Sequence, residues 1–385
     1  MDFDFSEDQV MIIDSARKFL EKECPKEKVR ELREDVKGYD PEMWRKMVEM
    51  GWMGLILPEE YEGTGLEFMD LTLLMEEMGK NILPGPFFPT VALCSLPILE
   101  YGTSEQKKNI LSKIACGEAI WTLALTEASA SYEPSGVELR ATLADGFVLE
   151  GTKLFVPYAN VADYLLVVAR TNQKENPEEG ITVFIVDAKT PGVKIEVMPT
   201  TAHDKQCEVM FDKVKFPKDS VLGEIDKGWE VVAFIIQRAS VLKCAEMLGG
   251  AQTVLEMANS YAKERVQFDK PIGSFQAIQH KLANMLIDVE GLRYLVYEAA
   301  WNISTGSPSR LLTSMAKAKA NEVYQRTCIQ GVKVHGAIGF TEELDLSLYF
   351  LRTKASEFAL GDTSFHTERI AVELEHHRPL FAQYH

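Results

Sequence analysis

The chain has 385 residues, of which 46% are hydrophobic and 26% charged, so it is long enough for two or three domains with a large core. Its net charge of −17 disfavours nucleic acid and anionic membranes as partners, because both attract basic surfaces. No apolar run reaches the roughly 18 residues of a membrane span, and the acidic start MDFDFSEDQV does not resemble a targeting peptide. We therefore expect a cytoplasmic protein that binds neither nucleic acid nor membrane.

The first third of the sequence is predicted to be helical. Ser6 is suited to cap a first helix, with acidic residues in its first turn. Apolar residues then recur at helical spacing, and further helices are predicted at 43–50, at 69–78 and from Ser104 onward. The prolines between 84 and 89 interrupt the pattern.

The middle of the sequence has the pattern of β-structure. From Trp121 to about Phe216 the apolar runs are short and rich in β-branched and aromatic residues. Asp145-Gly146 and Pro191-Gly192 are turn signals beside these runs. The segment therefore predicts a small antiparallel β domain.

Long amphipathic helices return after Gly228. They are predicted at 228–262, 273–304, 308–336 and 357–375, and could pack as a four-helix bundle. The sequence thus predicts an α+β fold with an N-terminal helical domain (1–121), a central β domain (122–225) and a C-terminal helical bundle (226–385).

No metal site is predicted. The six cysteines are scattered without a CxxC pair, which favours free thiols in a reducing compartment. His376 and His377 are adjacent, so on a helix they point to different faces and we expect a solvated end.

Several segments, in order, resemble the acyl-CoA dehydrogenase family from end to end. The segments that carry this resemblance are GWMGLILPEEYEGTGL (51–66), YGTSEQKKNILSKIACGE (101–118), ALTEASAS (124–131), GTKLFVPYANVADYLLVVAR (151–170), GEIDKGWEVV (223–232), YAKERVQFDKPIGSFQAIQ (261–279) and VKVHGAIGFTEE (332–343).

The resemblance implies FAD as the cofactor. An isoalloxazine ring needs a flat slot of backbone groups and apolar faces with a few donors. Leu125, Thr126, Phe155 and Val156 stand where the family has those contacts. The alternative for Phe155 is an ordinary core aromatic of a strand.

Arg265 is implied as the residue that binds the FAD pyrophosphate, because a planar guanidinium suits a doubly charged anion. Phe268 and Gln276 follow at the family's spacing, and Thr363 is a further implied cofactor contact. The alternative for Arg265 is a solvated helix residue.

The segment with Lys333, His335 and Gly336 reaches the cofactor of a neighbouring subunit in relatives, as does the Arg265 segment. It therefore implies an oligomer, a homotetramer built as a dimer of dimers or a heterotetramer. A structural histidine at a helix end is the alternative for His335.

The family's catalytic Glu, which takes the α-proton of a CoA thioester, is missing by this comparison. Gly361 stands in its place, and the segment 236–240, where some relatives keep their Glu, has no acid. Asp362 is the nearest acid and our candidate base. The alternative is that Asp362 caps a helix over 363–375.

The expected substrate contacts include an apolar wall. Phe87, Phe88 and Thr90 lie in a stretch, 84–99, that has no carboxylate. The resemblance adds Ser131, Arg238 and Gly361 as further substrate-binding residues.

The function implied is that of a FAD-dependent acyl-CoA dehydrogenase with a relocated base. Its substrates are expected to be CoA thioesters, with cyclic or bulky acyl groups among them. Electron-transferring flavoprotein is the expected electron acceptor. Two alternatives remain open: a partner subunit of a heteromeric dehydrogenase without its own base, and a flavoprotein of this fold with another activity.

Overall fold

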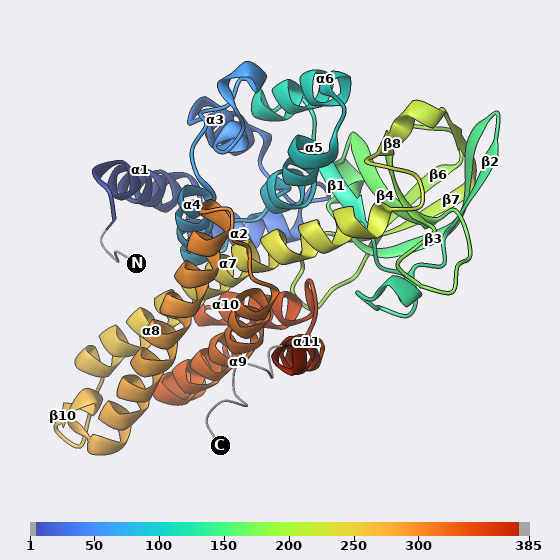
Figure 1. Cartoon of the computed structure of the whole chain (residues 1–385). Helices are drawn as coiled ribbons and strands as arrows, with labels where there is room; N and C mark the ends of the chain where they lie inside the picture. The colour runs from blue at the N-terminus through green and yellow to red at the C-terminus, as the bar shows by residue number, and fades with distance from the viewer. Residues whose placement is uncertain (1–4, 377–385) are drawn as a thin grey trace. The chain divides into compact units, whose positions relative to one another are not determined.

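The structure is a computed structural model that describes residues 5–376, and the side chains of His376 and His377 lie outside that description (Figure 1). The chain forms two compact units, each described here by itself. We call Met1–Val29, Glu67–Leu83 and Ser240–His385 the helical unit, and Arg30–Leu66 with Pro84–Ala239 the sheet unit. The three predicted domain boundaries stay a prediction.

The sheet unit contains short helices and one large sheet. Its helices are α3 (Pro41–Glu49), a π-helix at Pro89–Ser95, α5 (Leu96–Tyr101) and α6 (Ser104–Ala115); α2 (Lys26–Glu34) contributes residues to both units. Its strands are β1 (Trp121–Ala124), β2 (Arg140–Ala144), β3 (Gly146–Pro157), β4 (Tyr164–Arg170), β5 (Ile181–Asp187), β6 (Val193–Met198), β7 (Gln206–Phe216) and β8 (Val221–Leu222).

The sheet has the strand order β6-β7-β3-β2-β4-β5-β8, with β1 paired to β4 (Figure 1). Most neighbours are antiparallel, as predicted, but β1 and β2 both pair parallel to β4, so the sheet is mixed. The predicted turn at Asp145-Gly146 is confirmed, because Gly146 with φ 135° joins β2 to β3. The rings of Phe147, Phe184 and Phe216 meet in a core that buries one face of the strands.

The helical unit is built on long helices. They are α1 (Glu7–Glu23), α4 (Phe68–Asn81), α7 (Gly228–Glu264, which begins in the sheet unit), α8 (Gln276–Ser304), α9 (Arg310–His335), α10 (Leu346–Phe358) and α11 (Thr363–His376). Helix α9 packs against α8, α10 and α11. The predicted cap at Ser6 is confirmed. The Ser6 hydroxyl accepts a hydrogen bond from the backbone N of Gln9, and the Gln9 side-chain oxygen accepts one from the backbone N of Ser6.

One predicted helix is wrong. The segment 357–375 is not continuous, because α10 ends at Phe358 and α11 begins at Thr363. Between them Leu360 and Gly361 have φ values of 62° and 105°, in the left-handed region that ends a helix. The C-terminal region therefore has five α-helices among the described residues rather than four.

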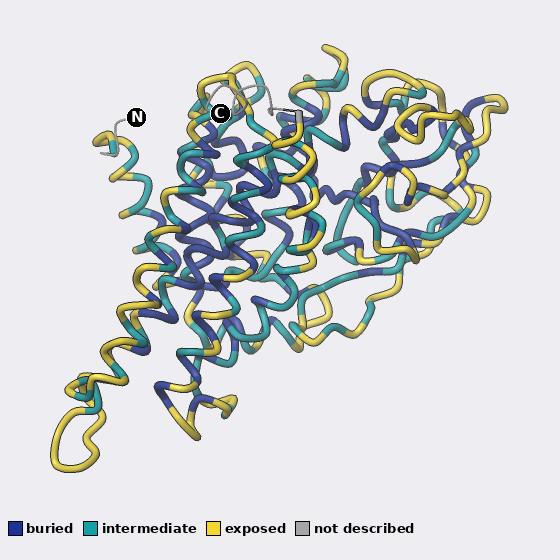
Figure 2. The backbone as a smooth tube through the Cα atoms, turned by 60° about the horizontal axis from the view of Figure 1, so that its bottom comes forward, coloured by how far each residue is buried: buried dark blue, intermediate teal, exposed yellow. Residues whose placement is uncertain are grey.

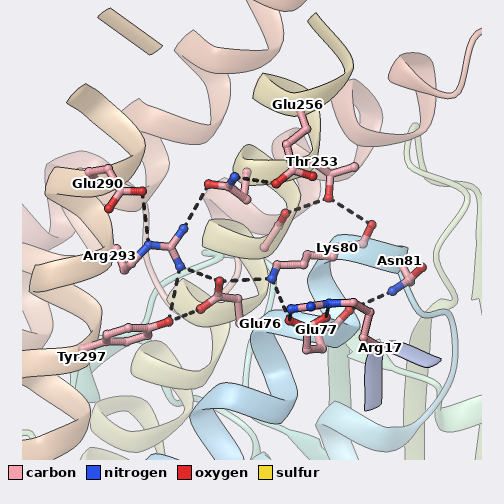
Figure 3. A network of polar contacts seen from close by, with 12 residues as sticks. Arg17, Glu76, Glu77, Lys80, Asn81, Thr253, Glu256, Glu290, Arg293 and Tyr297 are labelled. Atoms are coloured by element: carbon pink, nitrogen blue, oxygen red, sulfur yellow. Dashed lines mark hydrogen bonds and ion pairs between the residues drawn. The ribbon is translucent and has the colours of Figure 1, made fainter. Parts of the chain in front are cut away.

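A buried ionic network, which we call the Glu76–Arg293 network, ties α4 to α8 (Figure 3). Arg293 donates to Glu76 at 2.7 Å, and the Tyr297 hydroxyl donates to the other oxygen of the same carboxylate at 2.6 Å. The neighbouring Glu77 accepts from Lys80 at 2.7 Å and pairs with Arg17 at 3.1 Å. Burial alone would lower the pKa of Arg293, but the Glu76 carboxylate raises it.

Two kinds of feature are absent from the described residues. None of their helices is long and apolar enough to cross a membrane. No group of three or more His, Cys, Asp or Glu side chains in that part of the chain is arranged to hold a metal ion.

Candidate functional site

The loop that follows β1 is held by a buried ion pair. Lys153, fully buried on β3, donates to Glu127 at 2.6 Å and to the carbonyl of Leu125 at 2.9 Å. The Glu127 carboxylate also accepts from the backbone N of Glu138 and Leu139 at 3.0 Å. Burial lowers the pKa of Lys153 to about 8, although Glu127 opposes the shift. The pair therefore fixes the backbone of the predicted flavin loop.

Two predicted flavin contacts lie in that loop. The side chain of Leu125 is buried, and Thr126 donates its hydroxyl to the carbonyl of Leu154 at 2.5 Å. Leu154 donates in return from its backbone N to the carbonyl of Thr126 at 2.9 Å. The Thr126 oxygen can still accept a hydrogen bond from a ligand.

The two predicted contacts on β3 differ in exposure. Phe155 sits at a β-bulge with φ 54° and is 48% exposed, so the alternative of a core aromatic is wrong. A bulge turns a side chain out of the alternating pattern, and here it presents an aromatic ring on the surface. Val156 is buried in the sheet core, so only its backbone is left for a ligand.

The predicted apolar wall of the substrate site, within residues 84–99, is largely buried. Thr90 is fully buried and both donates to and accepts from the backbone of Trp121, at 3.2 and 3.1 Å. Phe87 is buried and lines a small hollow with Met43 and Trp44, whereas Phe88 is partly exposed. The residues that follow form a π-helix, a rare element that is frequent at functional sites.

Arg238 and Ser131 are the other substrate candidates in the sheet unit. The Arg238 guanidinium stacks 3.6 Å from the ring centroid of Phe234 and has no ion pair or hydrogen bond with the described residues. Burial lowers its pKa, with Glu100 and Tyr101 opposing. Its N–H donors thus remain for a ligand. Ser131 lies in a loop and accepts from the backbone N of Glu133 at 3.0 Å.

Three predicted cofactor residues lie together at the hairpin between α7 and α8, next to β9 (Val266–Gln267) and β10 (Lys270–Pro271). Arg265, Phe268 and Gln276 are all exposed, and Phe268 is 86% exposed. In Figure 2 the backbone of this hairpin has the colour of exposed residues. The ring of Phe268 meets that of Phe275 edge to face at 6.0 Å. An arginine and an aromatic ring exposed on one tip are suited to contact an anionic ligand.

The predicted residues at the end of α9 lie beside that hairpin. The His335 ring stacks 4.5 Å from Tyr261, one helical turn before Arg265. Its Nδ1 donates to the carbonyl of Gly331 at 2.8 Å, which supports a structural role and leaves Nε2 as an acceptor. Gly336, with φ 69°, ends the helix, and Lys333 is exposed.

The turn between α10 and α11 carries the candidate base. Asp362 accepts from the backbone N of Phe365 at 2.8 Å, so it does cap α11, as the alternative predicted. The carboxylate is partly exposed, and its second oxygen has no hydrogen bond with the described residues. At Gly361 an added Cβ would lie 2.3 Å from the ring of Phe365, so this backbone excludes a glutamate there. Thr363, the first residue of α11, is partly exposed.

Sequence reasoning missed two buried side chains behind this turn. Lys317 is fully buried and donates to the carbonyl of Gly361 at 3.0 Å, and His366 is 1% exposed with Nε2 3.0 Å from the carbonyl of Leu360. A signal existed for Lys317, because it lies at helical spacing before Ala320 and Tyr324, which belong to the buried apolar face of α9. No comparable signal marked Glu127 and Lys153, which come from separate segments.

The structure does not bring all predicted cofactor residues together. The turn contacts Lys317. Tyr261 on the last turn of α7, directly before the hairpin, contacts His335, and Lys317 and His335 lie about 27 Å apart along α9 at 1.5 Å per residue. In Figure 1 the labels α11 and β10 accordingly mark different ends of the helical unit.

Comparison with known proteins identifies the family. Three family models match in order: the acyl-CoA dehydrogenase N-terminal domain at residues 6–118, the middle domain at 122–214 and the C-terminal domain at 226–374. The CarC subunit of the caffeyl-CoA reductase–Etf complex of Acetobacterium woodii is 32% identical, over 88% of this chain and 90% of that protein.

Solved structures agree. Butyryl-CoA dehydrogenase from Megasphaera elsdenii matches with a TM-score of 0.91 and 29% identity, over 97% of this chain and 100% of that chain. The FAD complex of PigA matches with a TM-score of 0.89 and 25% identity, over 97% and 99%. The cofactor is therefore FAD, the reaction is an oxidoreduction on a CH–CH group, and the chain belongs to the acyl-CoA dehydrogenase family.

Proposed function

We propose that this acyl-CoA dehydrogenase uses Asp362 as the base that removes the α-proton of its CoA thioester. The observation that carries the proposal is the turn between α10 and α11. Gly361 leaves no room for a side chain, and the adjacent Asp362 keeps one carboxylate oxygen without a partner among the described residues.

The residues of this chain have separate parts in the reaction. Asp362 takes the α-proton, and FAD, when bound, supplies the hydride acceptor for the β-hydrogen. When FAD is bound, the Thr126 oxygen and the fixed backbone of its loop would hold the flavin edge, and the exposed ring of Phe155 would cover a flavin face. Arg238 has free donors for a polar group of the substrate, such as its CoA part. Phe88 and the buried wall around it suit an acyl chain.

We further propose a cyclic or bulky acyl group. Asp362 stands one residue later than the family's Glu and is one carbon shorter, so its carboxylate reaches a different volume. A base in another position selects another C–H bond or another substrate shape. An electron-transferring flavoprotein is the proposed electron acceptor, and the expected cytoplasmic location stays a prediction.

A homotetramer is the proposed assembly. The hairpin with Arg265 and the turn with Asp362 lie near opposite ends of α9, which disfavours their binding one cofactor within a single copy. In an oligomer the hairpin of a second copy would contact the cofactor at the first copy's turn. Helix α8 and the segment after α9 also expose large apolar side chains that a neighbouring copy would cover: Leu286, Ile287, Tyr294, Trp301, Ile338 and Phe340.

An anaerobic titration tests the proposed function. We would purify the chain alone with FAD, record its visible spectrum, and add straight-chain and alicyclic acyl-CoAs in turn. We expect bleaching of the flavin band by an alicyclic acyl-CoA. Asp362→Asn should slow bleaching by about 100-fold or more, since positioned acid–base catalysis contributes about that much. Asparagine also caps helices well, so the α11 cap should survive.

The exposed Glu368 on α11 supplies a matched control, and Glu368→Gln should bleach like the wild type. Bleaching at an unchanged rate in Asp362→Asn would contradict Asp362 as the base. A yellow protein that no acyl-CoA reduces would contradict an active single chain and point to a partner subunit that supplies the Glu.

A further inference from the structure

The turn that carries Asp362 has a backbone that the local sequence does not favour. Leu360 has φ 62° and Gly361 φ 105°, two successive left-handed residues. Leucine has a Cβ that crowds the carbonyl oxygen in this region. Such a conformation persists only where surrounding groups hold it, and conformations of this kind cluster at functional sites.

Lys317 holds the turn from α9. Its ammonium group is fully buried and donates to the carbonyls of Ser356, Glu357 and Gly361 at 3.1, 3.2 and 3.0 Å, and to Asn321 at 2.7 Å. It has no carboxylate partner among the described ion pairs. Its charge is compensated by the carbonyl dipoles at the end of α10 instead.

His366 holds the turn from α11. Because a carbonyl can only accept, the contact with Leu360 at 3.0 Å places the ring hydrogen on Nε2. Nδ1 is then an acceptor, and it is buried without a partner among the described residues. The His366 ring lies close to Gly361, because a Cβ atom added to this glycine would be 3.0 Å from Nε2. We call Lys317, Asn321 and His366 the turn cluster.

We propose that Lys317 and His366 are positioning residues that orient Asp362 and Thr363 for the reaction. The two side chains fix successive carbonyls, those of Leu360 and Gly361, and so fix the peptide planes directly before Asp362. The orientation of the Asp362 carboxylate follows from these planes together with its bond to Phe365. The assignment rests on the proposed function, because it gives these residues their role through Asp362.

Substitutions that keep or remove the donor test the proposal in the FAD-loaded protein. In His366→Gln the amide nitrogen can take the place of Nε2, whereas His366→Leu has no donor. We expect His366→Leu to lower kcat with the alicyclic acyl-CoA by about 10- to 100-fold, with KM within about threefold of wild type, as for a misplaced catalytic group. His366→Gln should recover most of the kcat.

Lysine substitutions give an independent arm. Lys317→Met should lower kcat in the same way. Lys319→Met on the same helix should leave kcat unchanged, because Lys319 is 34% exposed and only pairs with Asp288 at 3.7 Å. If His366→Leu does not fold, His366→Asn replaces it, since its shorter amide does not reach Leu360. Equal loss of kcat in the Gln and Leu variants would overturn the proposal.

Amide hydrogen exchange separates this proposal from the proposed function. In the FAD-loaded protein without substrate, His366→Leu and Lys317→Met should exchange about tenfold or more faster over residues 359–366, while His366→Gln and Lys319→Met should match the wild type. This result is expected even if no acyl-CoA reduces the flavin, which would refute only the proposed function. Unchanged exchange in all four variants would overturn the positioning role.

Discussion

Two buried polar clusters of the helical unit differ in how completely their charges and donors are paired. In the Glu76–Arg293 network each buried carboxylate meets cations or a hydroxyl (Figure 3). In the turn cluster a buried lysine meets only neutral oxygens, and His366 Nδ1 and Asn321 Nδ2 have no partner among the described residues.

The difference indicates different roles. A fully paired network suits a joint between helices, because each buried charge is compensated and the geometry is fixed. Unpaired buried groups cost stability and are retained where another requirement outweighs that cost. The turn cluster, which lies directly behind the residues proposed for catalysis, is such a place.

Breaking the paired network should have the largest effect on stability. Arg293→Leu would remove the cation that contacts Glu76 at 2.7 Å and leave this buried carboxylate with the Tyr297 hydroxyl and, at 3.7 Å, the ammonium group of Lys80. We expect a loss of about 3–5 kcal/mol in the free energy of unfolding, as for one partner removed from a buried pair. Urea denaturation of the FAD-loaded protein measures it.

Arg326→Leu is the matched control, because Arg326 is 51% exposed and pairs with Asp288 at 3.0 Å. Its cost should stay within about 1 kcal/mol. If Arg293→Leu cost no more than this control, the network would not be the joint that its contacts indicate.

The turn cluster should instead give an acid-dependent loss of stability. Burial and, to a lesser extent, the charge of Lys317 lower the pKa of His366 from its ordinary 6.5 to about 3. The folded protein thus binds this proton more weakly than the unfolded chain. The contribution of the neutral ring is complete above pH 6.5 and falls by about 1.4 kcal/mol per pH unit as the pH drops toward 3.

Comparison with His366→Gln isolates this effect, because glutamine does not titrate. Between pH 6.5 and pH 5 the wild type should lose about 2 kcal/mol more unfolding free energy than the variant. Parallel pH curves in urea denaturation would show that His366 is not held neutral by the fold.

The sequence predicted most features that depend on local patterns. The Ser6 cap and the helices near 43–50 and 69–78 follow from periodicity and capping, and the structure has them. The parallel pairing of β1 with β4 was not predictable in this way, because the two strands come together from distant segments.

The break at Gly361 had local signals that the helical periodicity of 357–375 obscured. A glycine in a left-handed conformation followed by an aspartate is a common end and start of helices. His366 was out of reach for another reason: its partner is a backbone carbonyl whose position depends on the turn itself. The exposure of Arg265 and Phe268 agrees with the role in FAD binding that the family resemblance implies, but only the folded structure shows that these side chains are exposed.

The smallest predicted effect concerns two threonines, one in each region. Thr353 lies on α10, the helix that ends at the turn, and its buried hydroxyl has no partner among the described residues. Thr253 on α7 donates to the carbonyls of Lys80 and Gly249 at 3.3 and 3.1 Å beside the paired network. Thr253→Val should cost about 1 kcal/mol, whereas Thr353→Val should cost nothing or stabilise, because it removes an unpaired buried group.

Urea denaturation of both variants at pH 7 makes this the finest test of the comparison. An equal cost would mean that the Thr353 hydroxyl has a partner, such as a buried water molecule. The buried polar groups around the turn would then be paired as fully as those of the Glu76–Arg293 network, and they would need no functional explanation. A gain in stability for Thr353→Val, together with slower flavin bleaching, would show directly that this region gives up stability for function.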